Sequence, residues 1–583
     1  MVLGGAVAHV FCVIRERGPT WGYGLIAAVS FAAYLPVFWA GFVWDDAPSL
    51  TENPLIQAAD GLRRFWFTRQ PADYWPATDT MLWIEWRFWG THALGYHAVN
   101  LALHLGACLL LWRVLERLAI PGALLAAVLF AVHPVNVESV AWIAQRKNLL
   151  ALLGYLLAIY AFVRAEESRE RLFPWYPLSL LCFIFALLSK GSVAPLPLVL
   201  IGIIGWRRTP TARDWARLSP FFCAAAGFAV LNVWFQTHGA GQIRAATPLA
   251  RLLGASTAIW FYCGKALWPT RLSFMYPLWH VDPSALRWWL PVAAVAALTL
   301  VLIAKSRGDA AGPWRKALFA WGYCGVLLLP ALGFADVGFM RYSLVADHYQ
   351  HLAIIGLLVF AAGFLTRLPV PLVALIVAVL TALSFRQSQT YHDAESLYRA
   401  TLRLNPGAWV AQDGLGVLLL NRGDNREAAE HFEAALRINP NDSDLAYNAG
   451  VALRRSEQGA VALDRFQQAA HLNPSRADAY SGIGLCADAL GRKAEAAAAF
   501  AQAEALDPRD AEIRTNLGYV LIELGRPADA VTELRSAVRL QPGSANAHLK
   551  LALALGLSGQ LLEAASEHAL GLRLRTSEPA AHP

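Results

Sequence analysis

Residues 369–406 read PVPLVALIVAVLTALSFRQSQTYHDAESLYRATLRLNP, and the composition of the chain changes within this stretch. Residues 369–385 carry no charge and are apolar enough for the interior of a bilayer. The segment from Arg386 to Asp393 is polar, and from there on the sequence is Ala-rich and regular. We therefore place the main domain boundary here, with a membrane domain before it and a polar helical domain after it.

The composition of the whole chain agrees with a membrane protein. Of its 583 residues, 56% are hydrophobic and 16% are charged, against about 25% charged in soluble proteins. The mean hydropathy is +0.40. These values exclude an average soluble protein, a disordered chain and a coiled coil.

The net charge of +7 fits basic cytoplasmic loops, so we expect no nucleic-acid partner. Seven cysteines without a CxxC pair predict neither a disulfide framework nor a zinc site.

The membrane domain is expected to cross the bilayer about eleven times, since apolar runs close to the length of a membrane helix recur before residue 386. The expected spans are 22–40, 94–112, 121–139, 149–165, 174–189, 192–206, 217–235, 288–304, 316–334, 349–366 and 369–385. Lys and Arg cluster at alternate ends of these spans. This pattern places the N-terminus in the cytoplasm and both residues 41–93 and the C-terminal half on the opposite side. Residues 252–268 are shorter and include Lys265, and we expect an interfacial helix there.

A repeat of 34 residues runs through the C-terminal half. Its prolines are Pro406, Pro440, Pro474, Pro508 and Pro542, and alanine and glycine positions keep the same spacing. A helix–turn–helix unit of this length is the tetratricopeptide repeat (TPR), in which small residues let the two helices approach and proline ends the second helix. We expect an α-solenoid whose concave face binds a peptide or protein; a structural spacer is the alternative.

The predicted fold class is therefore all-α, a multispanning helical bundle followed by a TPR solenoid. The bundle covers residues 1–385, with a catalytic external loop at 41–93. Residues 386–407 form the junction and a half repeat, 408–575 form five TPR repeats, and 576–583 form a disordered tail.

Asp45 and Asp46 are adjacent carboxylates that directly follow the first expected span. One can take a proton from a hydroxyl nucleophile while the other orients it or binds a divalent cation. A solvated loop or a helix N-cap is the alternative interpretation. We expect no other cofactor.

Further polar residues gather on the same expected face of the membrane. They are His133, Glu138, Arg146, Lys190, Lys265, Arg341, Asp347 and His348. Ionisable groups at membrane depth are costly, and a lipid phosphate would explain the cations among them. Snorkelling to a headgroup or a local ion pair is the alternative for each residue alone. His97, Asn100 and His104 share one helix face, where hydrogen bonds between helices would also explain them.

Several segments resemble the transmembrane and TPR-containing O-mannosyltransferase-like family. They are 41–46 (GFVWDD), Asn53 with Pro54, 95–100 (GYHAVN), 130–142 (FAVHPVNVESVAW), 188–191 (LSKG) and 346–349 (ADHY). The repeats follow the membrane part in the same order as in that family, so the likeness covers nearly the whole chain.

The resemblance implies a GT-C fold and transfer of a sugar from a polyprenyl-phosphate donor to a hydroxyl acceptor, such as Ser or Thr of a protein. It assigns the catalytic base to Asp45 or Asp46, with Asp45 preferred. From the resemblance, site lining falls on His133, Glu138, Arg146, Lys190 and His348, with Arg146 and Lys190 on the donor phosphate. Lys265, Arg341 and Asp347 are expected to line the site from their place on the same membrane face. Asn53, His97 and Asn100 are assigned to acceptor contact or structure, and the TPR face is expected to hold the acceptor.

The composition favours a bacterial inner membrane with periplasmic repeats; a eukaryotic chain would place them in the lumen of the endoplasmic reticulum. Two other functions fit the same sequence. One is an inactive membrane-anchored TPR scaffold for an envelope or secretion complex. The other is a ligase or flippase that acts on lipid-linked polysaccharide.

Overall fold

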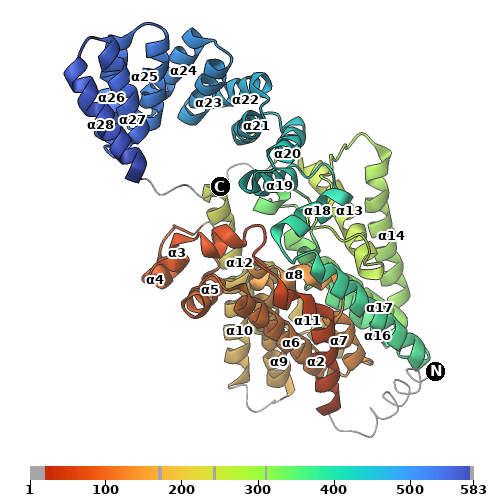
Figure 1. Cartoon of the computed structure of the whole chain (residues 1–583). Helices are drawn as coiled ribbons and strands as arrows, with labels where there is room; N and C mark the ends of the chain where they lie inside the picture. The colour runs from red at the N-terminus through yellow and green to blue at the C-terminus, as the bar shows by residue number, and fades with distance from the viewer. Residues whose placement is uncertain (1–19, 72, 168–173, 240–243, 309–311, 578–583) are drawn as a thin grey trace. The chain divides into compact units, whose positions relative to one another are not determined.

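The computed structural model describes residues 20–71, 73–167, 174–239, 244–308 and 312–577. The regular secondary structure of these residues is all helical, with no β-strand, which confirms the predicted all-α class. The chain divides into two compact units, one that ends at Asn405 and one that begins at Pro406 (Figure 1). The basic residues Arg15 and Arg17 and the tail residues 578–583 lie outside the described part.

The first unit contains helices α2 to α18. Their bounds are α2 Thr20–Tyr34, α3 Pro54–Gln57, α4 Gly61–Phe67, α5 Pro76–Trp89, α6 Ala93–Arg117, α7 Ala123–Ala131, α8 Val137–Ala141, α9 Arg146–Glu167, α10 Trp175–Ser189, α11 Leu196–Arg207, α12 Ala212–Gly239, α13 Pro248–Leu267, α14 Trp289–Ser306, α15 Pro313–Leu328, α16 Ile354–Leu365, α17 Val370–Gln389 and α18 Ala394–Leu404. In the bundle, α6 packs against α2, α7 and α9 (Figure 1).

Six helical segments within the described residues are long and apolar enough to cross a membrane, or seven if one bent pair counts as a span. The six are Thr20–Trp39, Ala93–Arg117, Ile143–Glu167, Ala212–Phe235, Leu286–Ser306 and Val370–Gln389. The chain is thus a membrane protein, although fewer helices reach full length than the eleven expected. Three of the other expected spans are apolar helices of 10–17 residues: Trp175–Ser189, Gly191–Arg207 and Ile354–Leu365.

The expected span 121–139 is broken. Helix α7 and the segment Pro134–Ala141 meet at 53°. Pro134 has no N–H to donate, and the Asn136 Nδ2 donates to the carbonyl of Phe130 over 2.7 Å at the free end of α7. The bend carries Glu138 on α8 into the buried centre of the unit, where the side chain is 2% exposed.

Residues 41–93 form a folded cap of short helices. A π-turn at Ala47–Thr51 leads into α3, α4 and α5. Their core contains Leu50, Ile56, Phe65 and Leu82, together with Tyr96 of α6. This apolar core fixes the direction in which the chain leaves the first span, and so it positions the two aspartates.

The second unit contains helices α19 to α28, arranged as helix pairs. Their bounds are α19 Trp409–Arg422, α20 Asn425–Ile438, α21 Ser443–Arg455, α22 Gly459–Leu472, α23 Ala477–Ala489, α24 Lys493–Leu506, α25 Ala511–Glu523, α26 Pro527–Leu540, α27 Ala545–Leu557 and α28 Leu561–Ser577. Consecutive helices pack on one another, as expected for a TPR solenoid (Figure 1).

Close approach within each pair explains the periodic glycines. A Cβ added at Gly450 would lie 2.9 Å from the ring of Phe466, and one at Gly484 would lie 2.7 Å from the ring of Phe500. The small residue of the first helix therefore makes room for the large residue of the second. This observation confirms the prediction that the small residues of the repeat let its two helices approach closely.

Helix α18 belongs to the first unit, although its sequence fits the repeat register. Asp393 caps it, accepting a hydrogen bond from Ser396 N over 2.7 Å. A hydrogen bond of 2.7 Å from Gly41 N to His392 O connects the turn before α18 to the first loop. The half repeat is thus fastened to the loop that contains Asp45.

Candidate active site

Asp46 is fully buried and bound to two separate parts of the backbone. Its Oδ2 accepts a hydrogen bond from Val43 N over 2.9 Å, and its Oδ1 accepts one from Ala144 N over 2.7 Å. Burial, with the neighbouring charge of Asp45, raises the pKa of Asp46 to about 8. Asp46 therefore joins the first loop to the segment before α9.

Asp45 is half-buried as a residue, and its Oδ1 is a buried atom without a hydrogen-bond partner among the described residues. Burial raises the pKa of Asp45, while Lys147 and then Trp142 act in the opposite direction. A carboxylate with a free oxygen and a raised pKa is suited to accept a proton from a substrate hydroxyl. The structure thus separates the two aspartates, which the sequence could not do.

Trp44, the residue before Asp45, has a backbone φ of +50°. A bulky residue in this region is strained, and such strain is held only where the surroundings enforce it. The Trp44 ring packs on Phe274 at 5.2 Å, on Tyr342 at 5.8 Å and on Tyr398 at 6.3 Å between ring centroids. Three distant segments thus hold Trp44 and set the direction of the Asp45 side chain.

Two lysines lie close enough to interact electrostatically with each other. The Lys147 ammonium stands 4.4 Å from the ring centroid of Trp75, and Lys190 Nζ donates to Asn148 Oδ1 over 2.6 Å. Burial, and then the charge of Lys147, lower the pKa of Lys190 to about 7. Since Lys147 also interacts with Asp45, the two ammonium groups form a cationic region beside the candidate base.

Asp79 is a further acidic residue of this region that the sequence analysis missed. It lies in the first turn of α5, and burial raises its pKa to about 7 while Lys147 acts in the opposite direction. The neighbouring Thr78 Oγ1 donates to Ser189 O over 3.1 Å and holds the start of α5 beside Lys190. The signal was weak, because Asp79 stands alone in a Trp-rich stretch that gave no motif.

Glu138 joins the bent segment to the 347–350 turn. Its Oε2 accepts a hydrogen bond from His348 N over 2.9 Å, and its Oε1 lies 3.0 Å from His348 Nδ1. Burial, followed by the charges of Lys190 and Lys147, lowers the pKa of His348. His348 is therefore neutral near pH 7 and supplies no fixed positive charge for a phosphate.

Arg146 is fully buried and held by three partners. Nε donates to Asn100 Oδ1 over 2.7 Å, one terminal nitrogen donates to the carbonyl of Tyr96 over 2.6 Å, and the other pairs with Glu85. This geometry does not favour the expected contact of Arg146 with a donor phosphate. The residue joins α9, α6 and α5, and its partner Glu85 was not foreseen.

The family comparisons cover both units. A TPR family model matches residues 379–443 and 447–511, and a second one matches 489–555. "Protein O-mannosyl-transferase F38B6.6" of Caenorhabditis elegans is 24% identical over 455 residues, which are 72% of this chain and 63% of the relative. Human "Protein O-mannosyl-transferase TMTC4" is 30% identical over 203 residues, which are 30% of this chain and 27% of the relative. The chain is a homologue of the protein O-mannosyl-transferases. It spans less than two thirds of the length of either relative.

Among solved structures, the crystal structure of the MamA protein resembles this chain over 30% of its length and 98% of the MamA chain, with 21% identity and a TM-score of 0.28.

The remaining expected site residues of this O-mannosyl-transferase homologue hold the backbone. His133 Nε2 donates to Ala266 O over 3.0 Å, and His97 Nε2 donates to Gly41 O over 3.2 Å. Asn53 caps α3 by accepting a hydrogen bond from Leu55 N over 2.9 Å. Asn100 Nδ2 donates to Val140 O over 3.1 Å in addition to its bond with Arg146. These contacts give all four residues structural roles in this conformation.

The last three expected residues lie around the 338–350 segment. Asp347 Oδ1 accepts a hydrogen bond from the Tyr276 hydroxyl over 2.9 Å, and burial with the charge of Glu138 raises its pKa. Lys265 Nζ donates to the carbonyls of Thr270 and Arg271, each over 3.0 Å. Arg341 is exposed at the end of the short helix Gly338–Arg341. Lys265 is therefore engaged in holding its own loop.

A divalent cation at Asp45 and Asp46 stays a prediction. Each oxygen of Asp46 accepts one backbone hydrogen bond, and Asp45 Oδ1 has no hydrogen-bond partner among the described residues. Within the described ranges no three His, Cys, Asp or Glu side chains gather as metal ligands.

Proposed function

We propose that this chain is a membrane glycosyltransferase. It moves a sugar from a polyprenyl-phosphate donor to a hydroxyl group of an acceptor protein on the non-cytoplasmic face. The homology to protein O-mannosyl-transferases supports the reaction class, and the buried, unpaired Oδ1 of Asp45 is the observation that carries the assignment of the site.

Asp45 is the catalytic base in this proposal. The acceptor hydroxyl gives its proton to Asp45 as its oxygen attacks the anomeric carbon of the sugar. The new glycosidic bond forms while the bond from that carbon to the phosphate oxygen breaks, and polyprenyl phosphate leaves with the electron pair. A direct displacement of this kind inverts the anomeric centre. A positioned base contributes roughly 10²–10⁴-fold to such a rate.

Lys147 and Lys190 take the place that Arg146 was expected to fill at the donor phosphate. The Lys147 ammonium interacts with both Asp45 and Lys190, whereas the Arg146 guanidinium is engaged with Glu85, Asn100 and Tyr96. An ammonium group binds phosphate as a point charge and neutralises the negative charge that builds on the leaving group.

The second unit is proposed to hold the acceptor protein. TPR solenoids offer an extended concave surface for peptides, and this unit has the helix pairs that form one. The compartment is proposed to be the periplasm of a bacterium, or the lumen of the endoplasmic reticulum in a eukaryote.

The decisive experiment is Asp45→Asn, assayed with polyprenyl-phosphate mannose and a Ser/Thr peptide in membranes that contain the full chain. We expect transfer to fall by at least 100-fold without loss of expression, because an amide does not accept the proton. Asp60→Asn is the matched control, since Asp60 lies in the same cap with a 66% exposed side chain. Full activity of Asp45→Asn would remove the mechanism.

A further inference from the structure

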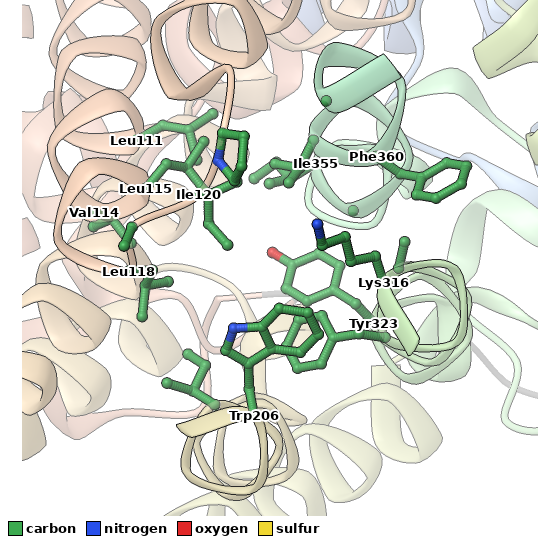
Figure 2. A pocket seen from close by; sticks show the side chains of 18 of the residues that line it. Leu111, Val114, Leu115, Leu118, Ile120, Trp206, Lys316, Tyr323, Ile355 and Phe360 are labelled. Carbon is green, nitrogen blue, oxygen red and sulfur yellow. The ribbon is translucent and has the colours of Figure 1, made fainter. Parts of the chain in front are cut away.

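An apolar groove with a volume of about 500 Å³ lies among α6, α9, α11, α15 and α16. Its walls include Leu115, Ile203, Phe319 and Ile355. Figure 2 shows these helices around a common space, with the Lys316 ammonium and the Tyr323 phenol on one side and Leu115, Leu118 and Ile120 on the other. The groove thus combines hydrocarbon walls with a cation.

Two basic residues, Lys316 and Arg367, line this groove. Within the part of the chain that the structure describes, neither Lys316 nor Arg367 makes an ion pair or a side-chain hydrogen bond, and both are exposed. Their neighbours are engaged: Arg117 pairs with Glu167 over 2.6 Å, and Arg315 donates to Gly205 O over 2.9 Å. Lys316 and Arg367 are therefore available to an anion.

The groove is remote from Asp45. Helix α6 meets the first loop at His97, whose Nε2 donates to Gly41 O, and it lines the groove with Leu111, Val114 and Leu115. At about 1.5 Å of rise per residue, 14 to 18 residues of α6 separate the two places by roughly 20–27 Å. The groove also lies at the helix ends that carry Arg117 and Arg207, which the positive-inside rule assigns to the cytoplasm.

We propose that this groove binds one anionic phospholipid of the cytoplasmic leaflet. An acyl chain would lie along the apolar walls, and the phosphate would lie between Lys316 and Arg367. Basic pockets between membrane helices on the cytoplasmic side are known to bind anionic headgroups, because their positive charge attracts the phosphate. A water-soluble anion would gain nothing from the hydrocarbon walls, and a peptide would leave its backbone groups without hydrogen bonds against them. This lipid site is separate from the proposed donor site and does not depend on it.

The test measures lipid binding to the purified full-length chain by native mass spectrometry. Phosphatidylglycerol is the anionic probe, and phosphatidylcholine with the same acyl chains is the neutral one. We expect Lys316→Ala with Arg367→Ala to weaken phosphatidylglycerol binding roughly 30-fold, since each basic residue near a headgroup adds about fivefold. The matched control is Lys305→Ala with Arg307→Ala, which removes the same charge at the end of α14 away from the groove.

A second variant tests the apolar part of the site with the charges intact. Val359 lines the groove from α16, and Val359→Trp fills the space that an acyl chain would occupy. We expect it to weaken phosphatidylglycerol binding at least tenfold while the thermal unfolding temperature of the lipid-free chain stays unchanged.

Three results would overturn the proposal. The first is unchanged phosphatidylglycerol binding in the Lys316 and Arg367 double variant. The second is equal affinity for phosphatidylcholine in the unmodified chain. The third is displacement of phosphatidylglycerol by an equal concentration of polyprenyl phosphate, which would assign the groove to the other lipid.

Discussion

At the scale of single residues, the two aspartates differ in what surrounds them. Both oxygens of Asp46 accept hydrogen bonds from backbone N–H groups. The Oδ1 of Asp45 is buried without a partner among the described residues, and Asp45 follows the strained Trp44. The sequence placed both carboxylates at the end of the first span. It could not separate them, because the donors from Ala144 and the rings around Trp44 come from segments far away in the chain.

Lys190 predicts a pH dependence of donor use. Its pKa in the free chain is lowered to about 7, so the ammonium is present below this pH and is lost as the pH rises through it. We expect kcat/KM for the donor to fall about tenfold per pH unit above neutrality, since kcat/KM reports the ionisation of free enzyme. In Lys190→Arg the guanidinium stays charged, so this alkaline decline should disappear.

Titration of transfer rates from pH 5 to 9 in both proteins measures the effect. Lys305→Arg, far from the site, serves as the control and should keep the original profile. An identical alkaline limb in the Lys190→Arg protein would show that another group is responsible.

Glu457 marks a weak point of the solenoid. Gly423, Gly491, Gly525 and Gly559 occupy the same place in other repeats with a φ near +70° to +90°, and Glu457 adopts a φ of +66° there. A residue with a Cβ in this conformation costs about 1 kcal/mol or more, so we expect Glu457→Gly to stabilise the second unit by about 1 kcal/mol.

Hydrogen exchange of the backbone amides in α21 and α22 provides the measurement, with exchange expected to slow about fivefold. Glu457→Ala removes the same charge but keeps the Cβ, and it should give no such protection. Equal protection in both variants would attribute the effect to charge.

At the scale of elements, helix α18 serves the first unit although its sequence continues the repeat. The backbone bond from Gly41 to His392 and the contact of Trp44 with Tyr398 connect it to the loop of the candidate base. Asn405, just after the helix, donates from Nδ2 to Met275 O over 3.3 Å. The solenoid period was readable because it is local, whereas this attachment depends on contacts across the fold.

Two truncations test this attachment. A chain that ends at Asn405 keeps every contact of α18 named above, so we expect it to transfer sugar to a short peptide at a rate within about threefold of the full chain. A chain that ends at Gln389 loses the packing of Tyr398 on Trp44 and the bond from Gly41 to His392. It should lose at least 10-fold in rate, because misplacement of a base by about 1 Å is costly. Both lack the second unit, so the comparison isolates α18. Equal rates in the two truncations would contradict the role given to this helix.

The eleven expected spans show where sequence reasoning fails at this scale. Composition identifies apolar runs, but it does not show that Pro134 bends one of them by 53° or that three others form short helices. An apolar run therefore does not by itself set the length or the straightness of the helix that forms within it.

At the scale of the whole molecule, the proposal requires residues 41–93 and the second unit to share one compartment. Cysteine labelling in sealed vesicles tests this requirement. In a chain with the exposed Cys223 replaced by Ser, we expect Asp60→Cys and Glu430→Cys to react with a membrane-impermeant reagent from the same side. Lys305→Cys should react from the opposite side. Opposite labelling of Asp60→Cys and Glu430→Cys would exclude a solenoid that presents substrates to this active site.

The short turn between α17 and α18 has a consequence for how such proteins diversify. Residues 390–393 connect the last membrane helix to the helix that supports Trp44, so an insertion there would disturb the site. Beyond Pro406, single repeats can be duplicated, lost or exchanged by recombination without altering the contact of α18 with Trp44. Under the proposed function, changes in the repeats would alter which acceptor proteins are bound and would leave the residues around Asp45 unchanged.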